Sequence, residues 1–353
     1  MKPTCLLARH INTAISINKT MKRIILLLFL MFAFDSFRAQ TITFISEKTN
    51  KPLPKVSVFG KDGSIVAFSD IDGKIDKQLI KPEQEKFRLV YENIVLAELP
   101  YSEIDKDIVK LDEKIKDIEP VVVKNNKPAK YLLIKGNFNA YVTVNNMLNC
   151  YVDGIATYVF DNKNKKVKDI KIQQYRIFSL EGATFEKKEV GVWDYRMFLD
   201  LPKLKYAGNL EKYNNGELKV KELKTPTKDE IEIRGEELQE KELSILGYRL
   251  FDIRVIANFS FEKDYKKSLR DFTEYNSIEY LKLKHKTEPE YNQIISYKNF
   301  YPTELDFSND KDIAEVKYDK KQGHYTSKYW EDSSFPNMQT VFSSFFKDDL
   351  KEK

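Results

Sequence analysis

Short runs of β-type residues, interrupted by turn residues, fill the sequence between positions 41 and 100. The runs are TITFISE, VSVFG, SIVAFSD, KIDKQLI, KFRLVYE and IVLAELP. Asp62-Gly63 and Asp72-Gly73 lie between such runs. Asp-Gly is typical of hairpin turns, because glycine adopts positive φ without steric cost. Apolar residues that alternate over so few positions predict strands, and many short strands at this spacing predict a β-sandwich.

Two turn segments of this region carry a family resemblance. Pro52-Leu53 and residues 69–75, Ser-Asp-Ile-Asp-Gly-Lys-Ile, match the proline-leucine turn and the later Thr/Ser-Asp-x-x-Gly turn of the carboxypeptidase regulatory-like domain. Residues 109–111 and 118–123 resemble the end of this module in exported Gram-negative proteins. The resemblance covers residues 41–118. It implies a transthyretin-like (Ig-like) β-sandwich with a structural or interaction role and no catalytic residue.

The sequence upstream of the module is typical of a secretory signal. Met21 is followed by Lys22 and Arg23, then by an apolar run at residues 24–34, then by the small residue Ala39. This order of positive charge, apolar core and small residue is that of a cleavable signal peptide. The apolar run is shorter than the ~20 residues that span a membrane. We therefore expect a signal peptide at 21–39, preceded by an upstream extension at 1–20.

The charge balance of the exported chain argues against nucleic acid as a partner. Residues 1–39 hold six of the 59 Lys and Arg and one of the 54 Asp and Glu, which leaves 53 of each sign. Nucleic-acid-binding proteins carry a net or clustered excess of basic residues. Cys150 is the single cysteine after the signal, so no internal disulfide can form. A large exported chain without disulfides suggests the periplasm or an outer-membrane-associated location in a Gram-negative bacterium.

The second half of the chain is also rich in β-type runs. Residues 119–130 contain two prolines and two asparagines and predict a linker, and residues 131–353 predict a β-rich domain of no family that we recognise. Aromatic and β-branched residues predict strands. They are expected at 150–161 and 167–179 around a turn, at 247–264, and at 277–285 paired with 291–305. The mature chain is expected to have no transmembrane helix.

Two segments of this half suggest helices. The acidic stretch 225–243 is one. The other begins near Pro336, where apolar residues recur at helical spacing; they are Met338, Val341, Phe342 and Phe345. The predicted fold class is therefore mainly β, α+β overall, with a few helices including a C-terminal one.

Candidate catalytic residues are few. A zinc carboxypeptidase uses a His-x-x-Glu pair and a distant His, and the sequence offers His285 with Glu288, followed by His324 only 39 residues later. His285 ends an alternating apolar run, so a histidine at the core edge is the alternative. Cys150 and His324 could be written as a nucleophile pair, but Cys150 lies in an apolar-aromatic run typical of a buried thiol. We predict no catalytic, cofactor-binding or metal site and no cofactor.

Two classes of function remain open. We expect an exported, non-enzymatic envelope protein that binds an unidentified envelope protein or ligand through its β-rich half, or that has a structural role. The alternative is a secreted hydrolase, a glycoside hydrolase or peptidase, with a carboxylate site that sequence spacing does not reveal. Converging carboxylates in a cleft would favour the hydrolase. A smooth groove or an apolar cavity would favour binding.

Overall fold

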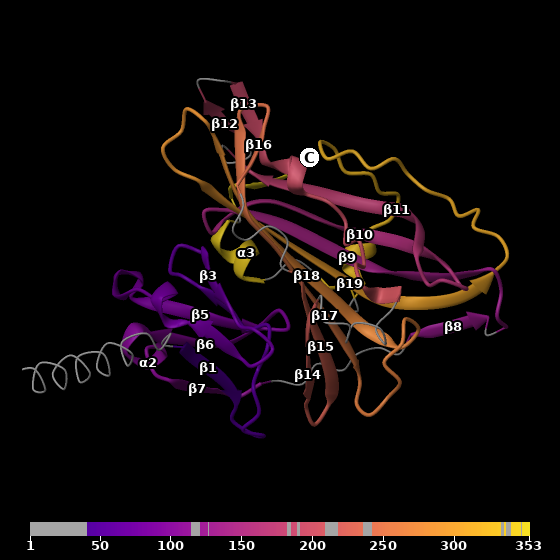
Figure 1. The fold of residues 1–353 in the computed structure, drawn as a ribbon, viewed down its shortest axis with the longest axis horizontal. Helices are drawn as coiled ribbons and strands as arrows, with labels where there is room; N and C mark the ends of the chain where they lie inside the picture. The colour runs from indigo at the N-terminus through magenta and orange to yellow at the C-terminus, as the bar shows by residue number, and fades with distance from the viewer. Residues whose placement is uncertain are drawn as a thin grey trace, which may run out of the picture.

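The chain is mostly β-structure, arranged as a small pair of sheets beside one large curved sheet (Figure 1). The computed structural model describes residues 41–113, 121–125, 127–181, 185–188, 191–208, 218–235, 242–332, 335–336, 340–346 and 348–353. The predicted signal peptide 21–39 and the extension 1–20 lie outside the described residues. Within the described ranges, no helix has the length and apolar character needed to cross a membrane.

Seven short strands form the N-terminal part, which we call the module. They are β1 (Thr41–Ser46), β2 (Ser57–Phe59), β3 (Ile65–Phe68), β4 (Lys74–Asp76), β5 (Lys86–Tyr91), β6 (Ile94–Pro100) and β7 (Ile108–Leu111). One sheet has the order β4-β1-β7 and the other β3-β2-β5-β6. A buried cluster with members from both sheets, including Phe44 and Phe87, lies between them. The module is thus sandwich-like, with short helical turns η1 (Lys77–Leu79), η2 (Pro82–Gln84) and α2 (Tyr101–Ile104).

The hairpins predicted at the two Asp-Gly turns differ in outcome. Asp62-Gly63 joins the antiparallel pair β2 and β3, so the hairpin predicted there is confirmed. The hairpin predicted at Asp72-Gly73 is wrong, because β4 leaves the sheet of β3 and pairs with β1. Gly73 still makes a tight turn, with φ 71°, and a Cβ there would lie 2.4 Å from the carbonyl oxygen of Phe44. The chain crosses between sheets at this turn, which buries Ile75 in the module core.

An eleven-stranded sheet forms most of the remaining structure. Its strands are β8 (Val122–Asn125), β9 (Tyr131–Val144), β10 (Met147–Asp161), β11 (Val167–Leu180), β14 (Lys219–Lys224), β15 (Lys228–Gly235), β16 (Leu243–Ile245), β17 (Tyr248–Glu262), β18 (Phe272–His285), β19 (Asn292–Ser308) and β20 (Leu350–Glu352). The main order is β14-β15-β17-β18-β19-β9-β10-β11-β20, with β16 beside β17 and β8 beside β19. Strand β8 lies within the range predicted as a linker.

Smaller elements complete the described part of the chain. They are the hairpin of β12 (Phe185–Lys188) and β13 (Gly191–Asp194), the 3₁₀ turns η3 (Tyr195–Phe198) and η5 (Tyr329–Glu331), and the helix α3 (Thr340–Phe345). Residues 337–339, where the predicted C-terminal helix would begin, lie outside the described residues, Met338 among them. Strand predictions for β10, β11, β17, β18 and β19 are confirmed, including the pairing of β18 with β19.

The helix expected at 225–243 is wrong for the residues that the structure describes there. Residues 228–235 form β15, which pairs with β14 on one side and β17 on the other. The reason is a period of two: Glu230 and Glu232 alternate with Ile231 and Ile233, and all four are buried. A helix would spread these residues around its circumference, whereas a strand separates them onto two faces.

The module and the large sheet share a hydrophobic cluster. Phe59 of β2 contacts Phe342 of α3, with ring centroids 5.6 Å apart. Phe342 contacts Tyr141 of β9 at 5.0 Å, and Tyr141 stacks on Tyr297 of β19 at 4.5 Å. Helix α3 lies between the module and the sheet in Figure 1. This cluster joins the module to one face of the sheet.

Candidate functional site

One face of the large sheet presents charged and amide side chains to the module. Ile231 and Ile233 of β15 belong to the main hydrophobic cluster of the sheet. The alternation of a strand therefore directs Glu230 and Glu232 to the opposite face. These two glutamates are only 3% and 2% exposed, although a carboxylate is rarely buried unless it is paired. Their partners come from both the module and the sheet.

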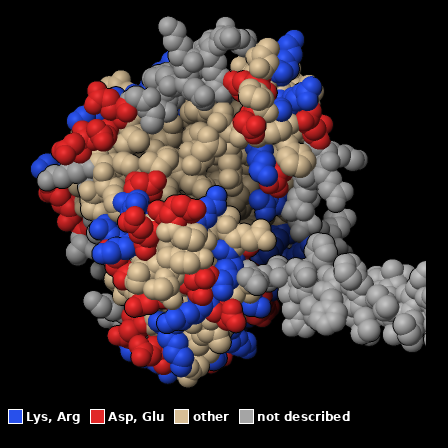
Figure 2. Space-filling model, turned by 90° about the vertical axis from the view of Figure 1, so that its left-hand side faces the viewer, with Lys and Arg blue, Asp and Glu red and all other residues tan. Residues whose placement is uncertain are grey.

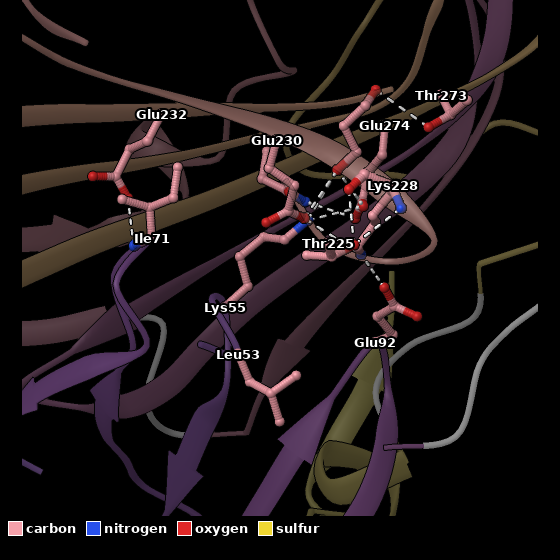
Figure 3. Close-up of polar contacts among 12 residues, drawn as sticks. Leu53, Lys55, Ile71, Glu92, Thr225, Lys228, Glu230, Glu232, Thr273 and Glu274 are labelled. Carbon is pink, nitrogen blue, oxygen red and sulfur yellow. Dashed lines mark hydrogen bonds and ion pairs between the residues drawn. The ribbon is translucent and has the colours of Figure 1, made fainter. Parts of the chain in front are cut away.

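Lys55 of the module reaches into this face (Figure 3). Its Nζ lies 3.0 Å from Glu230 Oε1 of β15 and 3.0 Å from Glu274 Oε2 of β18. It also donates to Ser260 Oγ of β17 at 3.2 Å. Three neighbouring strands thus each supply one acceptor to the three protons of one ammonium group.

A second lysine, Lys228 of β15, faces the module from the sheet side. Its Nζ forms an ion pair with Glu92, in the turn between β5 and β6, and lies 3.3 Å from Glu230 Oε1. It also lies 5.4 Å from the ring centroid of Tyr91. The two lysines share Glu230, so the contacts of the module and of the sheet form one buried network.

The electrostatic balance of this network keeps its members charged. Burial alone would raise the pKa of the Glu274 carboxyl, but the ammonium groups of Lys55 and Lys228 outweigh burial and lower it to about 2. The same lysines lower the pKa of Glu230 against a similar burial effect. Burial would lower the pKa of Lys55 and Lys228, and the carboxylates beside them raise it instead. All four groups are therefore ionised at neutral pH.

The turn at residues 69–75 makes a second polar contact with the sheet. The backbone N–H of Ile71 donates to Glu232 Oε2 at 3.1 Å. Arg234 of β15 donates to Glu232 Oε1 at 2.6 Å and to Asp70 Oδ2 at 3.3 Å. Asp70 also accepts from the backbone N–H of Lys74 at 2.9 Å, which closes the turn. The segment that carries the family resemblance is thus a docking element of the module.

Asparagines form a row across the same face of the sheet. Strand register places Asn258 of β17, Asn276 of β18, Asn299 of β19 and Asn139 of β9 side by side. Asn276 Nδ2 donates to Asn299 Oδ1 at 2.7 Å, and Asn299 Nδ2 donates to Asn139 Oδ1 at 2.6 Å. Asn139 in turn donates to the carbonyl oxygen of Pro336 at 3.3 Å. Hydrogen bonds that run in one direction along a chain of amide groups polarise and strengthen each other.

A cavity of about 60 Å³ lies between the module and this row. Its polar lining includes Lys55, Glu92, Asn93, Glu274, Asn276 and Asn299. The rings of Tyr141, Tyr297 and Tyr301 line it as well. A site for one water needs roughly 10–15 Å³, so this cavity has room for several waters or one small molecule. We regard this cavity and its charged network as the candidate functional site.

His285 and Glu288, the pair considered as zinc ligands, bond to each other and to neighbouring residues. His285 ends β18, is buried, and donates its backbone N–H to Glu288 Oε2 at 2.9 Å. Its Nδ1 lies 2.8 Å from Thr287 Oγ1, and its ring contacts that of Tyr248 at 5.1 Å. Glu288 and His285 therefore close the turn after β18. Among the described residues, no group of three His, Cys, Asp or Glu is placed to hold a metal ion.

The other sequence candidates lie far from His285. His324 is exposed and forms an isolated bridge with Tyr175 of β11. Strands β19, β9 and β10 separate β18 from β11, which corresponds to roughly 19 Å along the sheet at about 4.8 Å per strand. Cys150 is fully buried in β10, and burial raises the pKa of its thiol. A thiol in that state is a poor nucleophile.

We predict that the mature protein, purified without chelator, holds no stoichiometric zinc and that His285→Ala and Glu288→Ala leave its zinc content and function unchanged. The side chains of both residues already bond within one turn, and a zinc site needs about three protein ligands. Metal analysis of the three proteins checks this. One equivalent of zinc that disappears in His285→Ala would establish the site instead.

Sequence reasoning missed the residues of the charged network. The available signal was the segment Lys228-Asp-Glu-Ile-Glu-Ile-Arg234, in which charged residues and isoleucines alternate from Glu230 onward. Alternation of this kind indicates a strand with one polar face. That the polar face is buried follows only from the module that covers it.

Comparisons with known proteins identify no family for this chain. No protein-family model matches it, and no curated protein matches it. A solved structure described as "Lipid-protein interactions in lipovitellin" is similar over 56% of this chain, with 10% sequence identity and a TM-score of 0.28. The match covers 27% of that chain, so this chain spans about a quarter of it. A likeness at this TM-score supports no conclusion about function.

Proposed function

We propose that this chain is an exported, non-enzymatic protein of a Gram-negative envelope, in the periplasm or associated with the outer membrane. Residues 41–118 form a regulatory-like β-sandwich module, and residues 131–353 form a β-rich domain that binds a ligand or partner together with it. The signal-like order of residues 21–39 and the turn at 69–75 support export and the module assignment.

The charged network between module and sheet carries this proposal. Lys55 is a module residue whose ammonium is satisfied only by the sheet residues Glu230, Glu274 and Ser260. Removing one partner of such a buried pair is costly, so the network holds the module in one position. A fixed module gives a preformed cavity, and a preformed site lowers the entropic cost of binding. Figure 2 shows uncharged residues gathered between groups of charged side chains on the side of the molecule that lies to the left in Figure 1.

The carboxylates of the network suit binding better than hydrolysis. A general acid needs a carboxyl that holds its proton near neutral pH, whereas the pKa of Glu230 and of Glu274 is lowered. Burial does raise the pKa of Asp153 and of Glu232. These two lie on β10 and β15, five strand spacings or roughly 24 Å apart along the sheet, so they cannot act on one bond.

The proposal can be tested by a ligand screen that also detects turnover of each compound. The mature protein is mixed with small polyols, amino sugars, amines, short peptides and chromogenic glycosides, and both its melting temperature and the fate of each compound are followed. We expect at least one compound to raise the melting temperature without being consumed. Saturation at 100 times Kd adds about 2.7 kcal/mol to the free energy of unfolding.

The same screen can contradict the proposal. Product formed by the wild-type protein and lost in Glu274→Gln or Glu230→Gln would establish a hydrolase. A screen without any stabilising compound would contradict the binding role. Glu103→Gln, an exposed glutamate of α2 remote from the network, is the control for nonspecific effects of removing a carboxylate.

A further inference from the structure

Among the residues that the structure describes, the lining of the cavity beside the charged network contains one buried hydrogen-bond acceptor without a donor, Asn276 Oδ1. The ammonium of Lys55 already has three acceptors. Asn276 Nδ2 donates to both Glu274 Oε1 and Asn299 Oδ1. Asn276 Oδ1, by contrast, is buried without a hydrogen-bond partner in the described part of the chain, and the residue is 8% exposed. A buried acceptor without a donor is costly, so a ligand that supplies one is favoured.

A strained turn that carries a carboxylate forms part of the cavity lining. Glu92 and Asn93 join β5 to β6 with φ values of 48° and 63°. Both central residues of a two-residue hairpin adopt such values in a type I′ turn, where Asn and Gly are common and Glu is not. Backbone strain of this kind clusters at functional sites. Glu92 Oε1 pairs with Lys228, and its carboxylate is partly exposed beside the cavity.

The formal charge of the network is negative. Lys55 and Lys228 face Glu92, Glu230 and Glu274, so two positive groups meet three negative ones. The stacked rings of Tyr141 and Tyr297 form part of the cavity wall. Aromatic faces attract cations, above all where water is excluded.

We propose that this cavity binds a small organic ammonium group, either a free amine or the amine end of a larger molecule. The ammonium donates to Asn276 Oδ1 and to the carboxylate of Glu92, and its alkyl part lies against the tyrosine rings. The inference rests on the proposed binding function and adds the chemical class of the ligand. The negative charge of the network disfavours anions.

The test compares ethanolammonium with ethylene glycol, a neutral molecule of the same size. Each is titrated into the ¹⁵N-labelled mature protein at pH 7 and constant ionic strength, and the side-chain amide signals of Asn276 and Asn299 are followed by NMR. We expect ethanolammonium to shift these signals with a Kd of about millimolar, as suits a ligand of so few atoms. Ethylene glycol should bind at least about tenfold more weakly, a difference of about 1.4 kcal/mol.

Two substitutions in this turn should change the affinity in opposite directions. Glu92→Gln removes a carboxylate that pairs with Lys228 and also lines the cavity, and it is expected to weaken ethanolammonium binding about tenfold. Asn93→Asp adds a charge and is expected to tighten binding severalfold. Because Asn93 is partly exposed and aspartate tolerates positive φ, Asn93→Asp should fold normally. Glu98→Gln on β6, paired with Arg88 at the surface, is the control and should have no effect.

The outcomes separate this inference from the proposed function. Equal binding of ethanolammonium and ethylene glycol, or affinities unchanged in both Glu92→Gln and Asn93→Asp, would overturn the ammonium assignment. Neutral ligands from the screen that shift the Asn276 signals would then leave the binding function standing. If no compound shifts these signals, the cavity holds only water and the ammonium assignment fails. The binding function fails with it only when no compound of the screen raises the melting temperature.

Discussion

Replacing Lys55 with methionine is expected to lower the free energy of unfolding by about 3–5 kcal/mol. The substitution leaves the buried Glu230 and the mostly buried Glu274 without their shared ammonium partner. Methionine has nearly the same length, so the loss reflects charge rather than volume. Urea unfolding of the mature protein, followed by circular dichroism, measures the change.

A surface lysine and a pH series make this prediction specific. Lys48 pairs with Asp112 at the surface, so Lys48→Met should cost less than about 1 kcal/mol. The pKa of Glu274 falls from its ordinary value of 4.5 to about 2 on folding. Its contribution, on the order of 3 kcal/mol, is therefore complete above pH 4.5 and is lost as the pH falls toward 2. Lys55→Met should lose less stability over that window. Equal acid sensitivity of both proteins would contradict the assignment.

Replacing Phe59 with alanine is also expected to lower the free energy of unfolding by about 3–5 kcal/mol. Phe59 is fully buried, belongs to the module, and packs on Phe342 of α3 in the cluster that the module shares with the sheet. Its removal leaves a cavity where three parts of the chain meet. We expect hydrogen exchange to speed up first at the Phe346 amide, which bonds to the carbonyl of Phe342.

An exposed apolar residue of the module is the matched control for Phe59. Leu79 is 46% exposed, and Leu79→Ala should change the free energy of unfolding by no more than about 0.5 kcal/mol. A cost for Phe59→Ala below about 1 kcal/mol, or a loss of protection confined to the module core around Phe44, would show that the module does not depend on this contact.

Local sequence signals predicted the strands well. Aromatic and β-branched runs marked β10, β11, β17, β18 and β19, and the hairpin of β10 and β11 was predictable because a turn lies between two such runs. Strand β9 was not predicted. The hairpin at Asp62-Gly63 follows from turn chemistry in the same way. The strand pairing after Asp72-Gly73 could not be predicted in this way, because a tight turn specifies a change of direction but not the sheet in which the next strand pairs.

The candidate site could not be predicted in this way, because its parts come from distant positions. Lys55 and Glu274 are separated by 219 residues in the sequence, and nothing local marks either as half of a buried pair. Charged side chains are usually solvated, so their types alone predicted an exposed surface. The misread segment 228–235 shows the same limit, since its composition suggested a helix and only its pairing with β14 and β17 explains its alternation.

The sequence by itself determined that the chain is mainly β and where most of its strands lie, because period-two alternation and turn residues act over a few neighbouring positions. The tertiary structure alone decided which side chains meet. The row Asn258, Asn276, Asn299 and Asn139 exists because four strands align in one register, and a slip of one residue would turn each amide to the other face. The tertiary structure also decided the charge states of Lys55, Glu230 and Glu274, because these residues become buried and paired only when the module covers the sheet.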